Sequence, residues 1–102
     1  MGVRENKVEK YLHSEIEKMG GTTRKWVSPG QDGVPDRITF MDGRTTLVEV
    51  KTVDGELSVA QIREHARLRA HGITVTTVYG KGGVDLFTAN VFSWHNASQE
   101  YR

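Results

Sequence analysis

Residues 33–51 read GVPDRITFMDGRTTLVEVK, and this stretch decides the fold. The β-branched and aromatic residues of the run 36–41 favour a strand, as do those of the run 45–51. The dipeptide Asp42-Gly43 lies between the two runs and is typical of the tight turn of a β-hairpin. The stretch therefore predicts two antiparallel strands joined by a short turn.

The second strand of this hairpin carries charged side chains beside an apolar row. Side chains alternate between the two faces of a strand, so we expect Glu49 and Lys51 on one face. Val48 and Val50 then point to the other face. An antiparallel partner would bring Asp36 alongside the acid and the lysine. Two carboxylates and a lysine at neighbouring strand ends predict a divalent-metal site with a charge-stabilising group beside it. A purely structural ion-pair cluster is the alternative.

The chain before the hairpin predicts a helix and a short strand. Residues 4–19 carry apolar side chains at helical spacing, and a Gly-Gly pair ends the run. These apolar residues are Val8, Tyr11, Leu12, Ile16 and Met19. On the same helix Glu9 and His13 lie four residues apart and share a face. Residues 22–27 favour a strand, with Trp26 near its end.

A second helix is predicted after the hairpin. Ser58 and Gln61 match the S-x-x-Q capping box, and Gly72 stops the helix. A narrow apolar stripe is expected to face the core: Val59, Ile62, Ala66 and Leu68. A row of basic residues recurs every four positions: Arg63, Arg67 and His71. Such a row either follows a phosphate backbone or forms a solvated face.

The last third of the chain begins with its most β-branched run. Residues 73–79 read ITVTTVY and follow a helix, which predicts a βαβ crossover. This strand should then be parallel to the run 45–51 and central in the sheet. Beyond it we expect a turn at 80–83, a short edge strand at 84–87, a helix from Thr88 to about Asn96 and a frayed tail at 98–102. The predicted class is α/β, with a mixed sheet flanked by helices.

Composition sets the limits of this interpretation. The 102 residues fit one domain, 1–102, and 36% of them are hydrophobic, so the chain is expected to be globular. It contains no cysteine, which excludes disulfides and thiolate metal sites. The formal net charge is only +1, so any basic surface must be local. The charged N-terminal stretch and the lack of a long apolar run predict a soluble, cytoplasmic protein.

Glu49-Val50-Lys51 alone is a common kind of tripeptide, but its context is more specific. Four motifs follow one another in order: Glu9, PG-x-x-G-x-PDR at 29–37, LVEVK at 47–51 and LSVAQ at 57–61. Together they resemble the virus-type replication-repair nuclease (VRR-NUC) domain, a branch of the PD-(D/E)xK nuclease superfamily. The resemblance spans roughly residues 5 to 80 and implies a restriction-endonuclease-like core.

The resemblance also implies roles for particular residues. Asp36 and Glu49 would be metal-binding carboxylates, with the backbone carbonyl of Val50 as a further ligand. Lys51 would orient the attacking water and stabilise charge on the phosphate. Two more positions match the family's catalytic residues: Glu9, which would ligate the metal directly or through water, and Gln61 beside the lysine. An all-oxygen site of this kind suits Mg²⁺ or Mn²⁺.

The expected substrate is DNA. Candidate DNA-binding residues are Lys25, Arg37, Arg63 and Arg67, and His65 is a further candidate for contact with substrate. Small members of the family are mostly phage or bacterial proteins and resemble homodimeric enzymes that cut four-way (Holliday) junctions. The last predicted helix, with Phe92 and Trp94, is a candidate dimer interface. The alternatives are a nicking or flap nuclease, and a non-catalytic DNA-binding module that keeps the fold.

Overall fold

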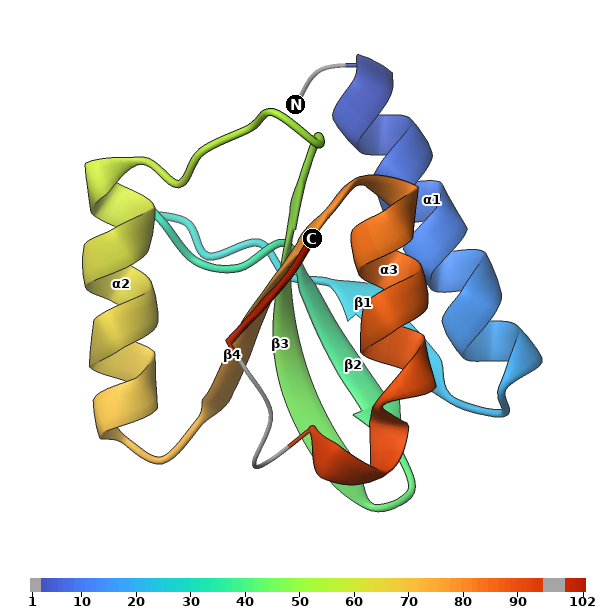
Figure 1. Cartoon of the computed structure of the whole chain (residues 1–102). Helices are drawn as coiled ribbons and strands as arrows, with labels where there is room; N and C mark the ends of the chain where they lie inside the picture. Colours follow the sequence, from blue (N-terminus) through green and yellow to red (C-terminus); the bar gives the residue numbers. More distant parts are fainter. Residues whose placement is uncertain (1–2, 95–98) are drawn as a thin grey trace.

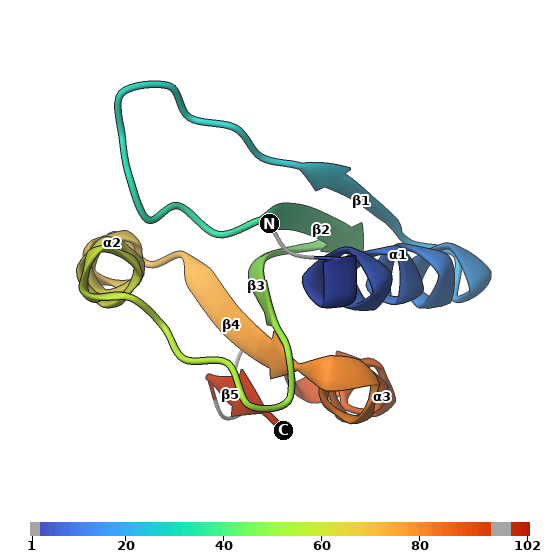
Figure 2. The same cartoon turned by 90° about the horizontal axis from the view of Figure 1, so that it is seen from above.

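Helices lie on both faces of a single sheet (Figures 1 and 2). The computed structural model describes residues 3–94 and 99–102. The elements in order are α1 (Val3–Lys18), β1 (Thr22–Lys25), β2 (Arg37–Met41), β3 (Arg44–Lys51), α2 (Val59–Ala70), β4 (Thr74–Tyr79), α3 (Gly80–Ala89), the 3₁₀ helix η1 (Val91–Ser93) and β5 (Glu100–Tyr101). α2 covers one face of the sheet, and α1 and α3 cover the other (Figure 2). The α/β class with a mixed sheet is confirmed.

The sheet combines an antiparallel hairpin with a parallel crossover. Its five strands lie in the order β1-β2-β3-β4-β5. β1, β2 and β3 pair antiparallel, whereas β4 is parallel to both β3 and β5. The hairpin turn has positive φ angles at Asp42 (51°) and Gly43 (73°), as a two-residue turn of the primed type requires. The predicted hairpin and the predicted parallel, interior β4 are both confirmed.

The two faces of β3 differ in character. Val48 and Val50 are fully buried in the main core with α1 and α3. Glu49 points to the opposite face, where it contacts side chains of α2. The alternation expected from the sequence is therefore confirmed, and it places the charged row of β3 beneath α2.

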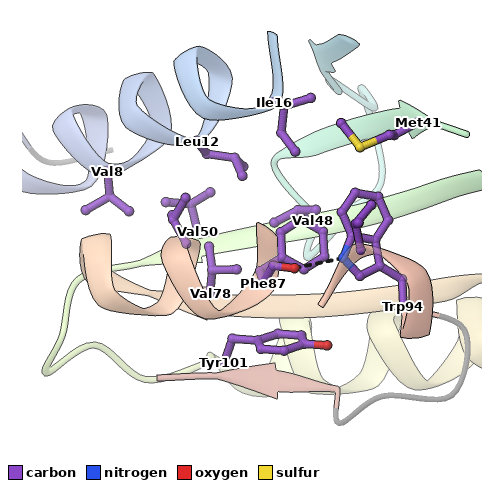
Figure 3. Packing of buried hydrophobic residues seen from close by; sticks show 12 residues of the cluster. Val8, Leu12, Ile16, Met41, Val48, Val50, Val78, Phe87, Trp94 and Tyr101 are labelled. Atoms are coloured by element: carbon purple, nitrogen blue, oxygen red, sulfur yellow. Dashed lines mark hydrogen bonds between the residues drawn. The ribbon is translucent and has the colours of Figure 1, made fainter. Parts of the chain in front are cut away.

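The core lies between the sheet and the pair α1 and α3 (Figure 3). Val8, Leu12 and Ile16 of the predicted stripe are buried and Tyr11 packs against them, whereas Met19 lies beyond the end of α1 and is 42% exposed. The rings of Phe87 and Trp94 stack with their centroids 4.4 Å apart and an interplanar angle of 9°. The indole Nε1 of Trp94 also donates a hydrogen bond of 2.8 Å to the carbonyl oxygen of Phe87. Trp94 is thus a core residue of this chain.

The segment after β4 is helical, so the predicted turn at 80–83 and edge strand at 84–87 are wrong. α3 begins directly at Gly80, and Val84 and Phe87 face the core from it. Three glycines make this a poor helix in isolation, but they allow close packing. A Cβ at Gly83 would lie only 2.4 Å from the carbonyl oxygen of Tyr101, so glycine lets α3 approach β5. Tertiary packing has overridden local propensity here.

The end of the chain also differs from expectation. Thr88 does not cap a last helix, because it lies in the last turn of α3 and donates to the carbonyl oxygen of Asp85 at 3.1 Å. Between α3 and β5 the structure describes the short η1, and Asn96 lies outside the described residues. Glu100 and Tyr101 form β5 rather than a frayed tail, because β4 offers them a free edge for parallel pairing. Ser98 also lies outside the described residues.

The orientation of α2 differs from the predicted one. Val59 and Ile62 are 63% and 54% exposed and Ala66 is exposed, so most of the predicted stripe faces outward, while Leu68 is half-buried. The buried residues of α2 are instead Glu64 and His65. The sheet face beneath them carries Glu49, so polar groups on the helix meet polar groups on the sheet. The polar interior of this layer is the candidate functional site.

Candidate active site

A carboxylate pair lies where β2 begins and β3 ends. Asp36 directly precedes β2, and its Oδ2 accepts a hydrogen bond of 2.8 Å from the backbone N–H of Val50. Glu49 precedes that valine on β3 and is 2% exposed. The glycine loop before Asp36 packs tightly on α2: a Cβ at Gly33 (φ 85°) would lie 2.3 Å from the carbonyl oxygen of Ala60. Only glycine fits that position, so the loop geometry fixes the approach of Asp36.

The surroundings of both carboxyl groups disfavour their charged forms. Burial raises the pKa of Asp36 to about 7, and repulsion from Glu49 adds to this. Burial likewise raises the pKa of Glu49 to about 7, although Lys51 acts in the opposite direction. Two acids that ionise with such difficulty lack enough positive charge nearby. A divalent cation would supply it.

Three side chains surround the carboxylate of Glu49. Its Oε2 accepts a hydrogen bond of 3.2 Å from Nε2 of Gln61 and lies 3.9 Å from Nζ of Lys51. Its Oε1 lies 3.4 Å from Nε2 of His65. The lysine side chain is 12% exposed, so its ammonium lies at the boundary between this buried cluster and solvent. The structure thus brings together the predicted acid, lysine and glutamine.

Gln61 serves two purposes at once, as its two sequence readings suggested. Its Oε1 accepts a hydrogen bond of 2.8 Å from the backbone N–H of Ser58, and its own N–H donates to Oγ of Ser58 at 3.1 Å. These contacts complete the capping box of α2. The Nε2 group at the other end of the carboxamide donates to Glu49. The helix cap therefore orients a donor toward the carboxylate pair.

Glu9 lies in a second cluster on the α1 side of the sheet. Its carboxylate accepts hydrogen bonds from Nζ of Lys25 at 3.1 Å and from Nη1 of Arg37 at 3.2 Å. Arg37 also lies 2.9 Å from Nδ1 of His13, which must accept because a guanidinium only donates. Arg37 pairs in register with Lys25 and with Val48, and paired residues share a face. This row therefore faces α1, whereas Glu49 faces α2.

The second cluster forms a basic pocket. The pocket has a volume of about 410 Å³ and is lined by Asn6, Glu9, Lys10, His13, Lys25 and Arg37.

The charge of Glu9 also acts on the carboxylate pair. Burial is the main cause of the raised pKa of Asp36 and of Glu49, and the negative charge of Glu9 contributes to both shifts. Glu9 therefore acts on the carboxylate pair through the electric field, while its own oxygens bind the two cations.

The remaining candidate residues occupy α2 and β1. Arg63 is exposed, and Nη1 of Arg67 forms an ion pair of 2.7 Å with Glu64. His65 is fully buried, so the expectation that it contacts substrate is wrong. Trp26 is half-buried and is not part of the core cluster. Neither arginine belongs to the carboxylate cluster, and their expected contact with DNA stays a prediction.

The donor set fits a hard cation that keeps several waters. Within residues 3–94 and 99–102, no group of three or more His, Cys, Asp or Glu side chains is arranged to hold a metal ion. Asp36, Glu49 and the backbone carbonyl of Val50 would therefore be joined by water, which is the coordination that Mg²⁺ favours. Oε1 of Glu49 is buried and has no hydrogen-bond partner in the described part of the chain. A buried carboxylate oxygen without a hydrogen-bond partner, beside a second acid, fits the donor chemistry of a cation site.

Sequence reasoning singled out two histidines but did not find the contacts that they make with the site. His65 lies one turn after Gln61 and His13 lies one turn after Glu9, so helical spacing placed each on the face of a functional residue. That spacing was the available signal. It could not show that the first contacts Glu49 and the second Arg37, since both contacts are made across the fold.

Comparisons with known proteins agree with the geometry. No family model matches the sequence. A phage protein named "Putative nuclease p44", from Acyrthosiphon pisum secondary endosymbiont phage 1, is 46% identical over 71 residues, which are 69% of this chain and 76% of that protein. A solved structure described as a VRR_NUC domain matches with a TM-score of 0.78 and 30% identity, covering 86% of this chain and 97% of that one. The chain therefore belongs to the VRR-NUC family of nucleases.

Proposed function

We propose that this protein is a metal-dependent deoxyribonuclease that hydrolyses phosphodiester bonds at Asp36, Glu49 and Lys51. The observation that carries the proposal is the pair of acids, Asp36 half-buried and Glu49 buried, with raised pKa values beside a lysine in a VRR-NUC fold. Charged groups are costly to bury unless they have a function or a partner. A phosphodiester is anionic, so its hydrolysis needs the kind of positive charge that this site would concentrate.

Mg²⁺ or Mn²⁺ would be held by the carboxylates of Asp36 and Glu49 and by the backbone carbonyl of Val50. When bound, such an ion neutralises phosphate charge and lowers the pKa of coordinated water. Lys51 would orient the attacking water and stabilise charge that develops on the phosphate. Gln61 holds Oε2 of Glu49 and so fixes the carboxylate. Glu9 would act through a bound water, because its oxygens are engaged by cations.

DNA would contact basic groups on both sides of the carboxylate pair. On one side the basic pocket offers Lys10, Lys25 and Arg37. On the other side α2 offers Arg63 and Arg67. The net charge of the chain is only +1, so this local concentration of cations supports a specific binding surface.

Within the described residues, none of the helices has the length and apolar character needed to span a membrane.

We further propose that the protein acts as a homodimer on branched DNA. The interface expected around Trp94 is wrong, because that side chain is 1% exposed in the core; the side chain of Phe92 lies outside the described part. A better candidate is the outward stripe of α2, namely Val59, Ile62 and Ala66. A second copy related by a twofold axis would bury this stripe against its own counterpart. Two active sites would then face two strands of a symmetric junction.

The test is cleavage of a labelled four-way junction, a flap and a linear duplex, each with Mg²⁺, Mn²⁺ or EDTA. We expect metal-dependent cutting of the junction by the wild type and none by Lys51→Ala. Lys18→Ala is the matched control, because that lysine is 72% exposed and pairs only with Glu15 among the described residues. Preferential cutting of the flap would favour the flap-nuclease alternative. Binding without cutting would favour the non-catalytic module.

A further inference from the structure

Among the fully buried side chains with polar atoms, only that of Trp94 is larger than that of His65. The proposed chemistry does not yet use His65. It projects from α2 toward β3 and has no exposed surface. Within the described residues, neither of its ring nitrogens has a hydrogen-bond partner. A buried polar group without partners destabilises a fold. A residue kept under those conditions calls for a functional explanation.

The nearest acidic group to this imidazole is also unsatisfied. Nε2 of His65 lies 3.4 Å from Oε1 of Glu49, and that oxygen is buried without a hydrogen-bond partner in the described chain. The other oxygen of the same carboxylate receives the donor of Gln61. Gln61 and His65 lie four residues apart, so they project from one face of α2. One helix face thus presents a polar group to each oxygen of Glu49.

The carboxylate selects the tautomer of the imidazole. A neutral ring has one N–H and one lone pair. With the proton on Nε2, an N–H donor lies next to Oε1 of Glu49, 3.4 Å away. With the proton on Nδ1, the lone pair of Nε2 would face the negative oxygen, which is repulsive. The Nε2–H form is therefore the one that this geometry favours.

We propose that His65 is a positioning residue that fixes the carboxylate of Glu49 for a divalent cation. The inference rests on the proposed function, since it assigns Glu49 to the metal. Gln61 constrains Oε2 and His65 constrains Oε1, so the plane of the carboxylate is set from both ends before a metal arrives. Hydrogen-bonded groups behind a ligand orient it and raise its affinity for metal.

The chemistry of a neutral donor suits this task. A lysine or arginine in this place would neutralise Glu49 and compete with the cation. A neutral imidazole orients the carboxylate and leaves its negative charge available. The price is an imidazole buried with an unsatisfied Nδ1. His65 should therefore lower the stability of the metal-free protein while raising its affinity for metal.

The decisive experiment compares His65→Met with His65→Gln. Methionine fills a similar volume without a donor, and glutamine places an amide N–H near the position of Nε2. Mg²⁺ and Mn²⁺ binding is measured by calorimetry, and thermal unfolding is measured in EDTA. We expect His65→Met to bind metal about 10- to 100-fold more weakly, yet to unfold at the same or a higher temperature. His65→Gln should recover most of the affinity. His71→Met, at an exposed position at the end of the same helix, is the control.

Two outcomes would overturn the proposal. One is metal binding by His65→Met that equals that of the wild type. The other is a loss of stability and affinity that is the same in both variants, which would indicate a packing role. If His65→Met does not fold, His65→Asn replaces it, because its shorter amide cannot reach Oε1; equal affinities of the Asn and Gln variants would then contradict the proposal.

A spectroscopic test separates this inference from the nuclease assignment. The ¹⁵N shifts of His65 in the metal-free protein report which nitrogen carries the proton. We expect the Nε2–H tautomer in the wild type, and a spectrum with the Nδ1–H tautomer would refute the inference whether or not the protein cleaves DNA. Conversely, the expected tautomer and the expected metal affinities in a protein that does not cleave DNA would refute only the nuclease assignment.

Discussion

The partly buried Asp36 lies beside the fully buried Glu49, and burial raises the pKa of each carboxyl group to about 7. The two acids come from neighbouring antiparallel strands, and the backbone N–H of Val50 donates to the first of them at 2.8 Å. In the absence of metal the fold thus holds two acids that resist ionisation at neutral pH. The stability of the protein should therefore depend on pH and on divalent metal.

Glu49→Gln should stabilise the metal-free protein at neutral and alkaline pH. The pKa of Glu49 is raised on folding, so the folded state binds more protons than the unfolded state between about pH 4.5 and pH 7. Stability is consequently lost as pH rises through this window, and the neutral amide escapes that loss. We expect the variant to gain about 2 kcal/mol over the wild type near pH 8 in EDTA, and nothing near pH 4. Urea denaturation checks this.

The wild type alone does not isolate the effect of Glu49, because the titration of His65 changes stability with pH in the opposite direction. Burial lowers the pKa of His65 to about 4, and this group alone would make the protein more stable as pH rises from about 4 to 6.5. His65 is present in both proteins, so most of its contribution cancels when the free energy of unfolding of the wild type is subtracted from that of Glu49→Gln. A difference in free energy that stays constant across pH would show that Glu49 ionises normally.

Mg²⁺ should stabilise the wild type and leave Asp36→Asn unaffected. A ligand that binds only the folded state at about 100 times its dissociation constant adds about 2.7 kcal/mol to the free energy of unfolding. Removal of one carboxylate takes away one of the two acidic ligands. Differential scanning fluorimetry with Mg²⁺ and with EDTA measures the effect. Asp54→Asn, at an exposed aspartate outside the carboxylate pair, should respond to Mg²⁺ like the wild type.

The two roles of Gln61 can be separated by mutation. Ser58→Ala breaks the capping box and should cost about 1 kcal/mol of stability, but it leaves the donor toward Glu49 in place. Gln61→Ala removes the side-chain half of the capping box and the donor toward Glu49, while the backbone N–H of residue 61 can still donate to Ser58. We expect a similar loss of stability in the two variants, with a loss of metal affinity only in Gln61→Ala. Equal metal affinities of the two variants, measured on folded samples, would count against a role for Gln61 at the site.

The oligomeric state should depend on α2 and not on Trp94. Ile62→Asp places a charge on the outward stripe, and because Ile62 is 54% exposed the fold should tolerate it. We expect light scattering to show a dimer for the wild type and a monomer for Ile62→Asp. Trp94→Ala should instead destabilise the core by about 3–5 kcal/mol. A wild type that is monomeric at micromolar concentration would contradict the proposed dimer.

Local sequence patterns predicted the centre of this fold well. The hairpin from 36 to 51 has its own turn chemistry and alternation, so neighbouring residues determine it. The capping box of α2 is similarly local. These same segments carry Asp36, Glu49, Lys51 and Gln61, and so the candidate site followed from the sequence.

Features that depend on distant packing were not predictable in the same way. α3 begins at a glycine-rich segment and is stabilised by its contact with α1 and β5, which no local pattern indicates. The periodicity of α2 gave its apolar stripe but not its direction, because that depends on the polar face of β3. The role of His65 follows only from the contact between α2 and β3. Each of these features became visible when separate elements were brought together.

Cleavage of a labelled four-way junction by the wild type and by Lys51→Ala, with Mg²⁺ and with EDTA, tests the central claim most directly. The account predicts cutting by the wild type that needs Mg²⁺, and a rate at least about 100-fold lower for Lys51→Ala although the variant still binds DNA and Mg²⁺. Cutting in EDTA, or equal rates for the two proteins, would contradict a metal site at Asp36 and Glu49 that acts with Lys51.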